Sequence, residues 1–159
     1  DVGTISSLWE ANMEVLDPEH SGINLFDNNW KIYSRNSGMT GHKISAFADV
    51  HDSMITDGCR IRGTVKHSVL FAGVKVAEGA VVEDAVVMGG TTIERGAVVR
   101  HCIIAENVTI KENAVVGAMP EGDEHGVATV GSGITIGEGA VIGPKAMVRN
   151  NVEGGEEQW

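Results

Sequence analysis

Three consecutive segments decide the fold. Residues 65–81 read VKHSVLFAGVKVAEGAV, residues 82–98 read VEDAVVMGGTTIERGAV, and residues 99–115 read VRHCIIAENVTIKENAV. Each begins with Val, and aliphatic residues return at the same positions every 17 residues. A fixed period of this kind is typical of a solenoid, in which each coil packs only on its neighbours. We therefore predict that the segments are stacked coils.

The positions of the aliphatic residues within each coil predict a three-sided parallel β-helix. Sub-periods of six, six and five residues fit one short strand per face, with branched aliphatic residues inside and Gly, Asn and Asp at the corners. The predicted columns are Val65, Val82, Val99 and Val116; Val76, Ile93 and Ile110; Ser68-Val69-Leu70, Ala85-Val86-Val87 and Cys102-Ile103-Ile104; and, in steps of six, Val130, Ile136, Ile142 and Val148. This is a hexapeptide-repeat pattern, and the period predicts about five to six coils.

Two irregularities interrupt the period. The coils are predicted to begin near Val50, and the step from Val50 to Val65 is only 15 residues, which indicates a tighter corner at residues 62–64. Between Val116 and Val130 the chain carries nine additional residues, predicted to form a corner loop at residues 118–126. The predicted β-helix domain covers residues 44–159.

A short helix is predicted before the coils, at residues 1–16. Thr4 can be its N-cap, and Asp17-Pro18 is expected to end it. One face of this helix is apolar and carries Ile5, Leu8, Trp9, Met13 and Leu16. So short an apolar stripe cannot stabilise itself, so the helix must pack on another surface. Residues 17–43 are predicted to be an extended linker.

Composition narrows the possible partners. The net charge of −10 argues against nucleic acid, whose phosphates require clustered Lys and Arg. No apolar run is long enough for a membrane span, and no secretory leader is recognisable. Residue 1 is Asp rather than Met, which indicates a fragment. Cys59 and Cys102, expected at in-register strand positions, are interpreted as reduced, buried thiols of a cytoplasmic protein.

Charged residues also repeat at the period of 17. The columns are Lys66, Glu83 and Arg100; His67, Asp84 and His101; and Glu78, Arg95 and Glu112. Coils stack about 4.8 Å apart, so members of a column are neighbours. Two imidazoles and a carboxylate can bind a metal or act in catalysis. The favoured interpretation is a ladder of ion pairs that keeps the coils in register, and no metal site is predicted. His125, in the insertion, could belong to a lid, a partner contact or a solvated loop.

Several motifs in order resemble bacterial glucose-1-phosphate adenylyltransferase. They are Asp1-Val2-Gly3-Thr4 with Ser7-Leu8-Trp9-Glu10-Ala11-Asn12, Asn24-Leu25-Phe26-Asp27-Asn28-Asn29-Trp30-Lys31-Ile32-Tyr33, Gly58-Cys59, Gly63-Thr64-Val65, His67-Ser68-Val69-Leu70 and Glu83-Asp84-Ala85-Val86-Val87-Met88. The first pair is similar to the end of the family's catalytic domain, the second motif to its linker, and the rest to its regulatory β-helix.

The resemblance implies a left-handed β-helix that serves as the C-terminal regulatory and oligomerisation domain. The family forms ADP-glucose and pyrophosphate from ATP and glucose 1-phosphate with Mg²⁺, in glycogen synthesis, usually as tetramers. The expected partners are the protein's own catalytic domain, further copies or a sister subunit, and an anionic metabolite effector. Asp1 matches a family aspartate close to the sugar phosphate and metal, but the rest of that catalytic site is missing. We expect no cofactor in this chain and no nucleotidyl transfer by it alone.

The expected effector site departs from the family pattern. Glu106 stands where many relatives have a basic residue, so the resemblance predicts a weak response to sugar-bisphosphate activators. The remaining basic candidates are Lys145 and Arg149, since Lys and Arg bind anions. A free-standing hexapeptide acyltransferase that binds coenzyme A as a trimer, or a pure oligomerisation module, are the alternatives. Severed from a catalytic domain, the helix is expected to expose Leu8, Trp9 and Met13, and we predict self-association through it or through the sides of the β-helix.

Overall fold

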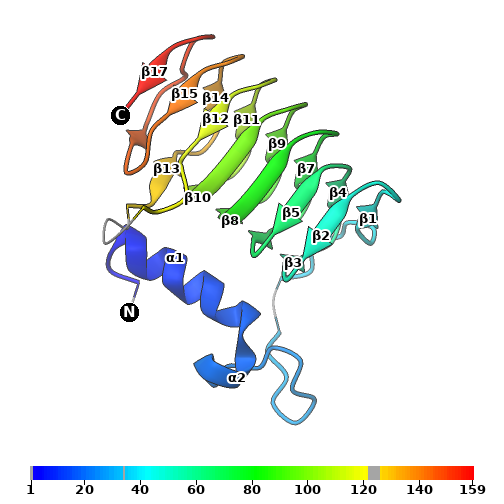
Figure 1. The fold of residues 1–159 in the computed structure, drawn as a ribbon. Coiled ribbons are helices and arrows are strands. Elements are labelled where there is room, and N and C mark those ends of the chain that lie inside the picture. Colours follow the sequence, from blue (N-terminus) through cyan, green and yellow to red (C-terminus); the bar gives the residue numbers. More distant parts are fainter. Residues whose placement is uncertain (1, 34, 122–125) are drawn as a thin grey trace.

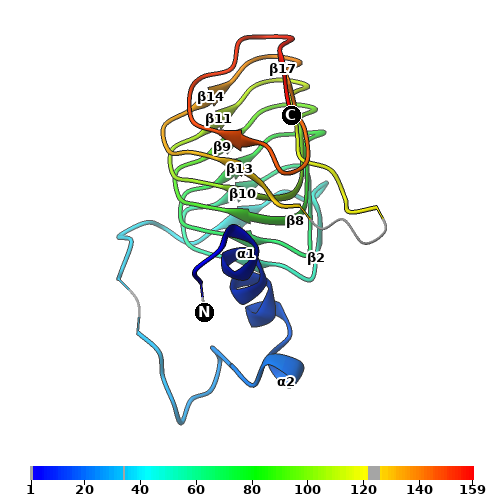
Figure 2. The same cartoon turned by 90° about the vertical axis from the view of Figure 1, so that its left-hand side faces the viewer.

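Short parallel strands form the body of the structure, a computed structural model that describes residues 2–33, 35–121 and 126–159. The strands stack coil upon coil along one axis (Figure 1). Seen obliquely along the stack, the coils enclose a single interior, and the N-terminal helix lies outside it (Figure 2). None of the helices in the described ranges is long and apolar enough to cross a membrane.

The elements follow in a regular order. The helices are α1 (Ile5–Met13), the 3-10 helix η1 (Glu14–Leu16) and α2 (Pro18–Ser21). The strands are β1 (Lys43–Ile44), β2 (Asp49–His51), β3 (Met54–Ile55), β4 (Arg60–Ile61), β5 (Thr64–Lys66), β6 (Val69–Leu70), β7 (Lys75–Val76), β8 (Val81–Val87), β9 (Thr92–Ile93), β10 (Val98–Ile104), β11 (Thr109–Ile110), β12 (Val115–Val116), β13 (Ala128–Val130), β14 (Thr135–Ile136), β15 (Val141–Ile142), β16 (Met147–Val148) and β17 (Glu157–Gln158).

The strand register confirms the predicted β-solenoid. Val82 pairs with Val65 and Val99, and Ile93 pairs with Val76 and Ile110, all in parallel. These side chains are buried in one continuous core. Fully burying a Val or Ile side chain contributes roughly 1.5–3 kcal/mol, so each coil is stabilised mainly by the aliphatic residues of its neighbours.

The number of coils is about seven, so the predicted five to six is too low. The additional coils lie at the two ends. At the N-terminal end, β1 pairs with β4 through Lys43 and Arg60. At the C-terminal end, β17 pairs with β15 through Glu157 and Gln158, whose polar side chains carry no aliphatic signal.

The shortened coil turns through a corner that only glycine fits. Thr64 pairs with Asp49, a step of 15, whereas Val81 pairs with Thr64, a step of 17. The predicted tight corner at residues 62–64 is therefore confirmed. A Cβ added to Gly63 would overlap the carbonyl oxygens of Ala77 and Ala80 in the next coil, which explains the absence of a side chain.

A longer step marks the insertion. Cys102 pairs with Ala128, a step of 26, and β12 pairs with β15 at the same interval. The strand pairing thus continues on either side of the additional residues, which lie between β12 and β13 in the chain. His125 lies outside the described residues.

The N-terminal helix begins as predicted and ends earlier. The Thr4 side chain accepts from the Ser7 amide, and the Ser7 side chain accepts from the Thr4 amide, which forms a capping box. Helix α1 stops at Met13 and continues as η1. Asp17-Pro18 does not simply end the helix: Asp17 caps the short helix α2, in which Pro18 is the first residue.

The prediction that the helix exposes its apolar face is wrong. Met13 is buried with Val86, Ile103 and Val127 of the solenoid, and Leu8 and Trp9 pack against the same cluster. Because α1 covers the solenoid of its own chain, Leu8, Trp9 and Met13 are not available to drive self-association, and only Ile5 of the named residues on this face is exposed.

The predicted register of the two cysteines is also wrong. Cys102 lies in β10 and pairs with Ala85 and Ala128, whereas Cys59 precedes β4 in the other sheet. Both thiols are free and buried. Burial raises the pKa of both thiols above the ordinary value of 9.0, far above it for Cys102.

Candidate functional site

Helix α1 meets the solenoid at a corner formed by His67, Asp84 and His101, which we name the corner column. The three residues have positive φ angles of 41°, 57° and 42°. This left-handed conformation lets β8 and β10 turn from one face to the next while their pairing continues, and Asp and His adopt it more readily than most residues. The corner geometry therefore explains both the residue types and their interval.

The Asp84 carboxylate joins the two imidazoles. Its Oδ1 accepts from His67 Nδ1 at 2.8 Å, and its Oδ2 accepts from His101 Nδ1 at 2.6 Å. Asp84 is 8% exposed and His101 only 4%, whereas the His67 side chain is 45% exposed. A buried carboxylate is stable only when it is hydrogen-bonded, so the two imidazoles stabilise Asp84 and orient each other.

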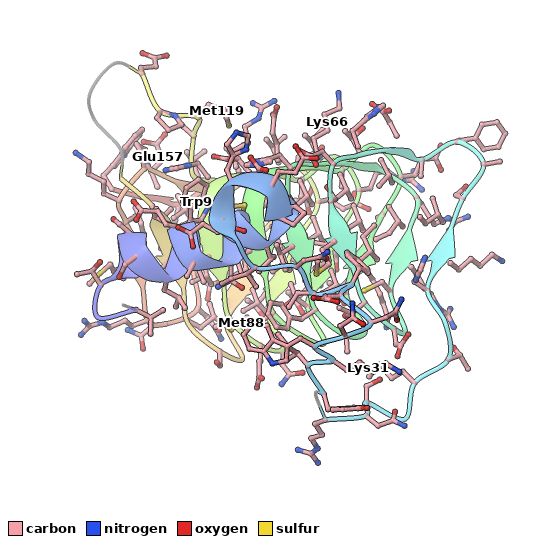
Figure 3. All side chains as sticks on the ribbon, turned by 90° about the horizontal axis from the view of Figure 1, so that it is seen from below. Trp9, Lys31, Lys66, Met88, Met119 and Glu157 are labelled. Carbon is pink, nitrogen blue, oxygen red and sulfur yellow. The ribbon has the colours of Figure 1, made fainter. Side chains whose placement is uncertain are left out.

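Trp9 connects helix α1 to the corner column through a hydrogen bond and a ring contact. Its indole Nε1 donates to the Asp84 carbonyl oxygen at 2.9 Å. The indole ring also lies 4.6 Å from the His101 ring, centroid to centroid, at an interplanar angle of 57°. Figure 3 shows Trp9 on α1 where the helix crosses the strands. The Trp9 side chain thus packs on the corner column and holds helix α1 against the solenoid.

A cleft of about 440 Å³ opens beside the corner column, and we name it the helix cleft. It is lined by Ser6, Trp9, Glu10, Asp84, His101, Met119, Pro120 and Val127. Its walls come from three elements: α1, the corner of β8 and β10, and the insertion. Within the described part of the chain, His101 Nε2 is a buried polar atom with no hydrogen-bond partner.

The geometry of the corner column fits a hydrogen-bonded ladder of two imidazoles and a carboxylate better than a metal site. Both imidazoles use Nδ1 for the carboxylate, which leaves Asp84 without a free oxygen. Over residues 2–33, 35–121 and 126–159, no group of three or more His, Cys, Asp or Glu residues has a metal-binding arrangement.

The other predicted charge columns form in part. Arg100 Nε pairs with Glu83 Oε2 at 3.1 Å, whereas Lys66 pairs with Asp49 at 3.3 Å rather than with Glu83. Glu78, Arg95 and Glu112 all line a groove of about 380 Å³, but no ion pair among them is found in the described contacts.

The effector candidates Lys145 and Arg149 stay predictions. Both are exposed. Lys145 lies at a corner with a φ of 67°, and its side chain covers Gly126, where an added Cβ would overlap it. Asp1, the catalytic candidate, lies outside the described residues. Glu106 is exposed.

A second cationic surface was missed by the sequence reasoning. Lys43, Arg60 and Lys75 pair across the neighbouring strands β1, β4 and β7 of one sheet, and we name them the basic column. All three are exposed, and none has an ion-pair partner among the described residues. Like charges in adjacent strands repel, so this column favours an anionic partner. The three residues lie 17 and then 15 positions apart, so a search for residues that recur every 17 positions does not find them.

The docking surface of α1 was missed as well, although a signal exists. In the long strands Ala85 and Val87 point into the core, and Val86 between them points outward. On the face formed by β9 and β11 the outward positions are polar, as at Thr92 and Thr109, and the outward Val81 and Val98 of the long strands stay only partly buried. Aliphatic residues at an outward position, here Val86 and Ile103, indicate that another element covers that face.

Comparisons with known proteins agree with this architecture. A family model described as "GlmU-like, C-terminal hexapeptide" matches residues 39–137. The glucose-1-phosphate adenylyltransferase of Geobacillus stearothermophilus is 52% identical over 83 residues, which are 52% of this chain and 21% of the relative. The enzyme of the same name from Bacillus mycoides strain KBAB4 is 54% identical over 85 residues, 54% of this chain and 22% of the relative. The chain thus spans about a fifth of the length of these relatives.

Among solved structures, the acetyltransferase domain of PglB from Neisseria gonorrhoeae FA1090 is similar over 73% of this chain and 50% of that one. The identity is 23% and the TM-score 0.30, too low to support any argument about function.

Proposed function

The chain belongs to the GlmU-like, C-terminal hexapeptide family, and from this premise we propose that it is the C-terminal regulatory and oligomerisation domain of a glucose-1-phosphate adenylyltransferase. The observation that carries the proposal is identity of 52–54% to enzymes of that name over half of this chain. Because the chain spans only about a fifth of those relatives, the nucleotidyl transfer itself is assigned to a longer parent protein.

The parent enzyme is proposed to form ADP-glucose and pyrophosphate from ATP and glucose 1-phosphate with Mg²⁺, and to assemble as an oligomer. Asp1 would complete a site built by the catalytic domain, since Mg²⁺ prefers oxygen ligands. No catalytic role is proposed for the solenoid, because the Asp84 carboxylate of the corner column already accepts hydrogen bonds from both imidazoles.

The solenoid suits a regulatory role because it is rigid and tied to the segment before it. Each coil is braced by the next, so a displacement at one face is transmitted rather than absorbed. Helix α1 is fixed to the solenoid by the Trp9–Asp84 hydrogen bond and the apolar cluster around Met13. A movement of the coils would therefore move α1 and any domain joined to it.

An anionic effector or partner is proposed to bind the exposed cations. Lys145 and Arg149 are the candidates from the sequence. The basic column is supported by more of the structure, because Lys43, Arg60 and the adjacent Arg62 line a hollow of about 720 Å³. Arg in such a hollow binds phosphate or carboxylate groups through paired hydrogen bonds.

A chimera tests the proposal. The matching region of the Geobacillus stearothermophilus enzyme is replaced by this chain, and ADP-glucose formation, oligomeric state and effector response are measured. We expect an active oligomer whose effector response is altered and depends on Arg60. A chimera that is monomeric and indifferent to every phosphorylated metabolite tested would refute the regulatory assignment.

The isolated chain separates the proposal from the acyltransferase alternative. With ATP, glucose 1-phosphate and Mg²⁺ it is expected to form no ADP-glucose. Acetyl coenzyme A is expected to leave its melting temperature unchanged, whereas a free-standing acyltransferase would be stabilised by its cofactor in proportion to saturation.

A further inference from the structure

The six-stranded sheet carries opposite charges at its two ends. Its strands follow one another along the stack in the order β1, β4, β7, β9, β11 and β14 (Figure 1). The basic column lies on the first three of these strands, and Arg62 directly follows β4. These are four exposed cations out of the 12 Lys and Arg residues of the chain. No acidic residue lies in β1, β4 or β7, so this end is positive although the chain has a net charge of −10.

The opposite end of the same sheet is acidic. Glu112 and Glu138 lie at the corners beyond β11 and β14, and Glu153 lies in the last coil, next to β14. All three are exposed, and none forms an ion pair in the described part of the chain. They line a hollow of about 670 Å³. Glu94 lines it too, but its pair with Lys111 at 3.0 Å adds no net charge, so this end is negative.

A shallow groove joins the two ends across the middle of the sheet. The groove of about 380 Å³ shares Arg60 and Arg62 with the basic hollow and Glu112 with the acidic one, and the oppositely charged Glu78 and Arg95 also line it. The outward positions of β9, β11 and β14 are all threonine, which is small and uncharged. Helix α1 packs on the other sheet, against β8 and β10, so it leaves this face uncovered.

We propose that this face binds the same face of a second copy in antiparallel orientation, an inference that rests on the proposed oligomerisation and names its surface. A two-fold axis between β7 and β9 would pair β1 with β14, and β4 with β11, of the second copy. Lys43 and Arg60 of each copy then lie opposite Glu138 and Glu112 of the other, and every contact occurs twice. The acidic end would repel nucleic acid and would leave a purely acidic protein only half matched. A second copy matches both ends at once.

The size of the face sets the expected affinity. Six strands spaced about 4.8 Å apart give a length of about 25 Å, and about five residues along the strands give a width of about 15 Å. Each copy would bury about 400 Å², about half of what a partner buries in a standard stable interface. We therefore expect the chain alone to form a reversible dimer with a Kd of about 100 µM, strengthened in the parent protein by any contacts of its other domain.

Charge exchange between the two ends tests the arrangement. Arg60→Glu with Arg62→Glu makes both ends acidic, and Glu138→Lys with Glu153→Lys makes both ends basic. Sedimentation equilibrium is measured at about 0.5 mM chain, where the expected Kd leaves most of the parent chain dimeric. Each double variant alone is expected to dimerise at least about tenfold more weakly, and their equimolar mixture at least as tightly as the parent chain. Both variants remain net negative, so attraction between them reports the local patches.

A matched control separates the face from general charge repulsion. Lys31→Glu with Arg35→Glu makes the same change in net charge on the exposed linker, and it is expected to change the Kd by less than about twofold. Circular dichroism checks folding, and Arg60→Gln with Arg62→Gln, expected to weaken the dimer about fivefold, replaces any unfolded charge-reversed variant. A parent chain that is monomeric at about 0.5 mM, equal weakening by the linker control, or a mixture that does not dimerise would overturn the proposal.

The dimer and the proposed function can fail separately. A monomeric chain whose chimera still assembles and responds to an effector would refute this face and leave the regulatory assignment intact. Restored dimerisation in the mixture, together with a chimera that neither assembles nor responds, would support the face and refute the assignment. A monomeric chain that binds a phosphorylated metabolite through Arg60 would make the basic hollow an effector site alone and overturn the dimer.

Discussion

Replacing Asp84 is the sharpest test of how the helix and the coils are held together. Its carboxylate accepts from His67 at 2.8 Å and from His101 at 2.6 Å, and its backbone is left-handed with a φ of 57°. Two substitutions separate these contributions. Asp84→Ala removes both acceptors and places Ala in the left-handed region, whereas Asp84→Asn keeps one oxygen and tolerates that conformation.

The expected losses follow from burial. The bond to His101 is buried and accepted by a charged group, so its loss reduces the free energy of unfolding by about 2–3 kcal/mol. The bond to His67 is screened by solvent because that side chain is 45% exposed, and it adds at most about 0.5–1 kcal/mol. Left-handed strain adds about 1 kcal/mol for Ala. Asp84→Ala should thus lower stability by about 4 kcal/mol, and Asp84→Asn by about 1–2 kcal/mol because it still accepts from His101.

Urea unfolding followed by circular dichroism measures both variants, and hydrogen exchange of the α1 amides reports whether the helix detaches first. The Trp9 bond is accepted by the backbone oxygen of Asp84, so it survives both substitutions. An Asp84→Ala variant within about 1 kcal/mol of the parent would show that the corner column contributes only a solvated ion pair. Equal losses for Ala and Asn would contradict the assigned roles of the second oxygen and of the backbone.

Two further predictions concern the corners and the thiols. Gly63→Ala should lower the free energy of unfolding by more than about 2 kcal/mol, because its Cβ would overlap backbone carbonyls of the next coil. The control Gly41→Ala, with open space around the glycine, should change this free energy by no more than about 0.5 kcal/mol. Thermal unfolding of both variants tests the difference. Cys102 should not react with a thiol reagent at pH 8 until urea unfolds the chain, because burial raises its pKa and suppresses the thiolate. Since the folded state keeps its thiol protons when the unfolded state loses them, stability should fall as pH rises above about 8.5; a stability profile that is flat or rising there would contradict the burial of both cysteines.

The solenoid could be predicted because its coils repeat the same local rule. Each inward Val or Ile packs against the equivalent residues of the coils before and after it, so the sequence repeats with the period of the coils. The capping of α1 by Thr4 is equally local. The end coils were missed because their strands, such as Glu157–Gln158, place polar residues at positions where aliphatic residues carry the signal.

The candidate site depends on contacts between distant parts of the chain. Periodicity brought His67, Asp84 and His101 together, because all three lie at one corner of successive coils. It could not place Trp9, which is separated from Asp84 by 75 residues and by a linker without a period. The outward Val86 and Ile103 show that something covers that face, but only tertiary packing identifies the cover as α1.

Helix α1 packs across the middle of the stack of coils and braces it. It contacts β8 and the corner residues of β10, with further coils on both sides (Figure 1). Shearing one coil over the next is therefore hardest near Asp84 and easier at the first coil, where Ile44 is 44% and Phe47 93% exposed. A partner that binds α1 would therefore act directly on the middle coils, whereas a partner that binds the first coil would act on them through the coils in between.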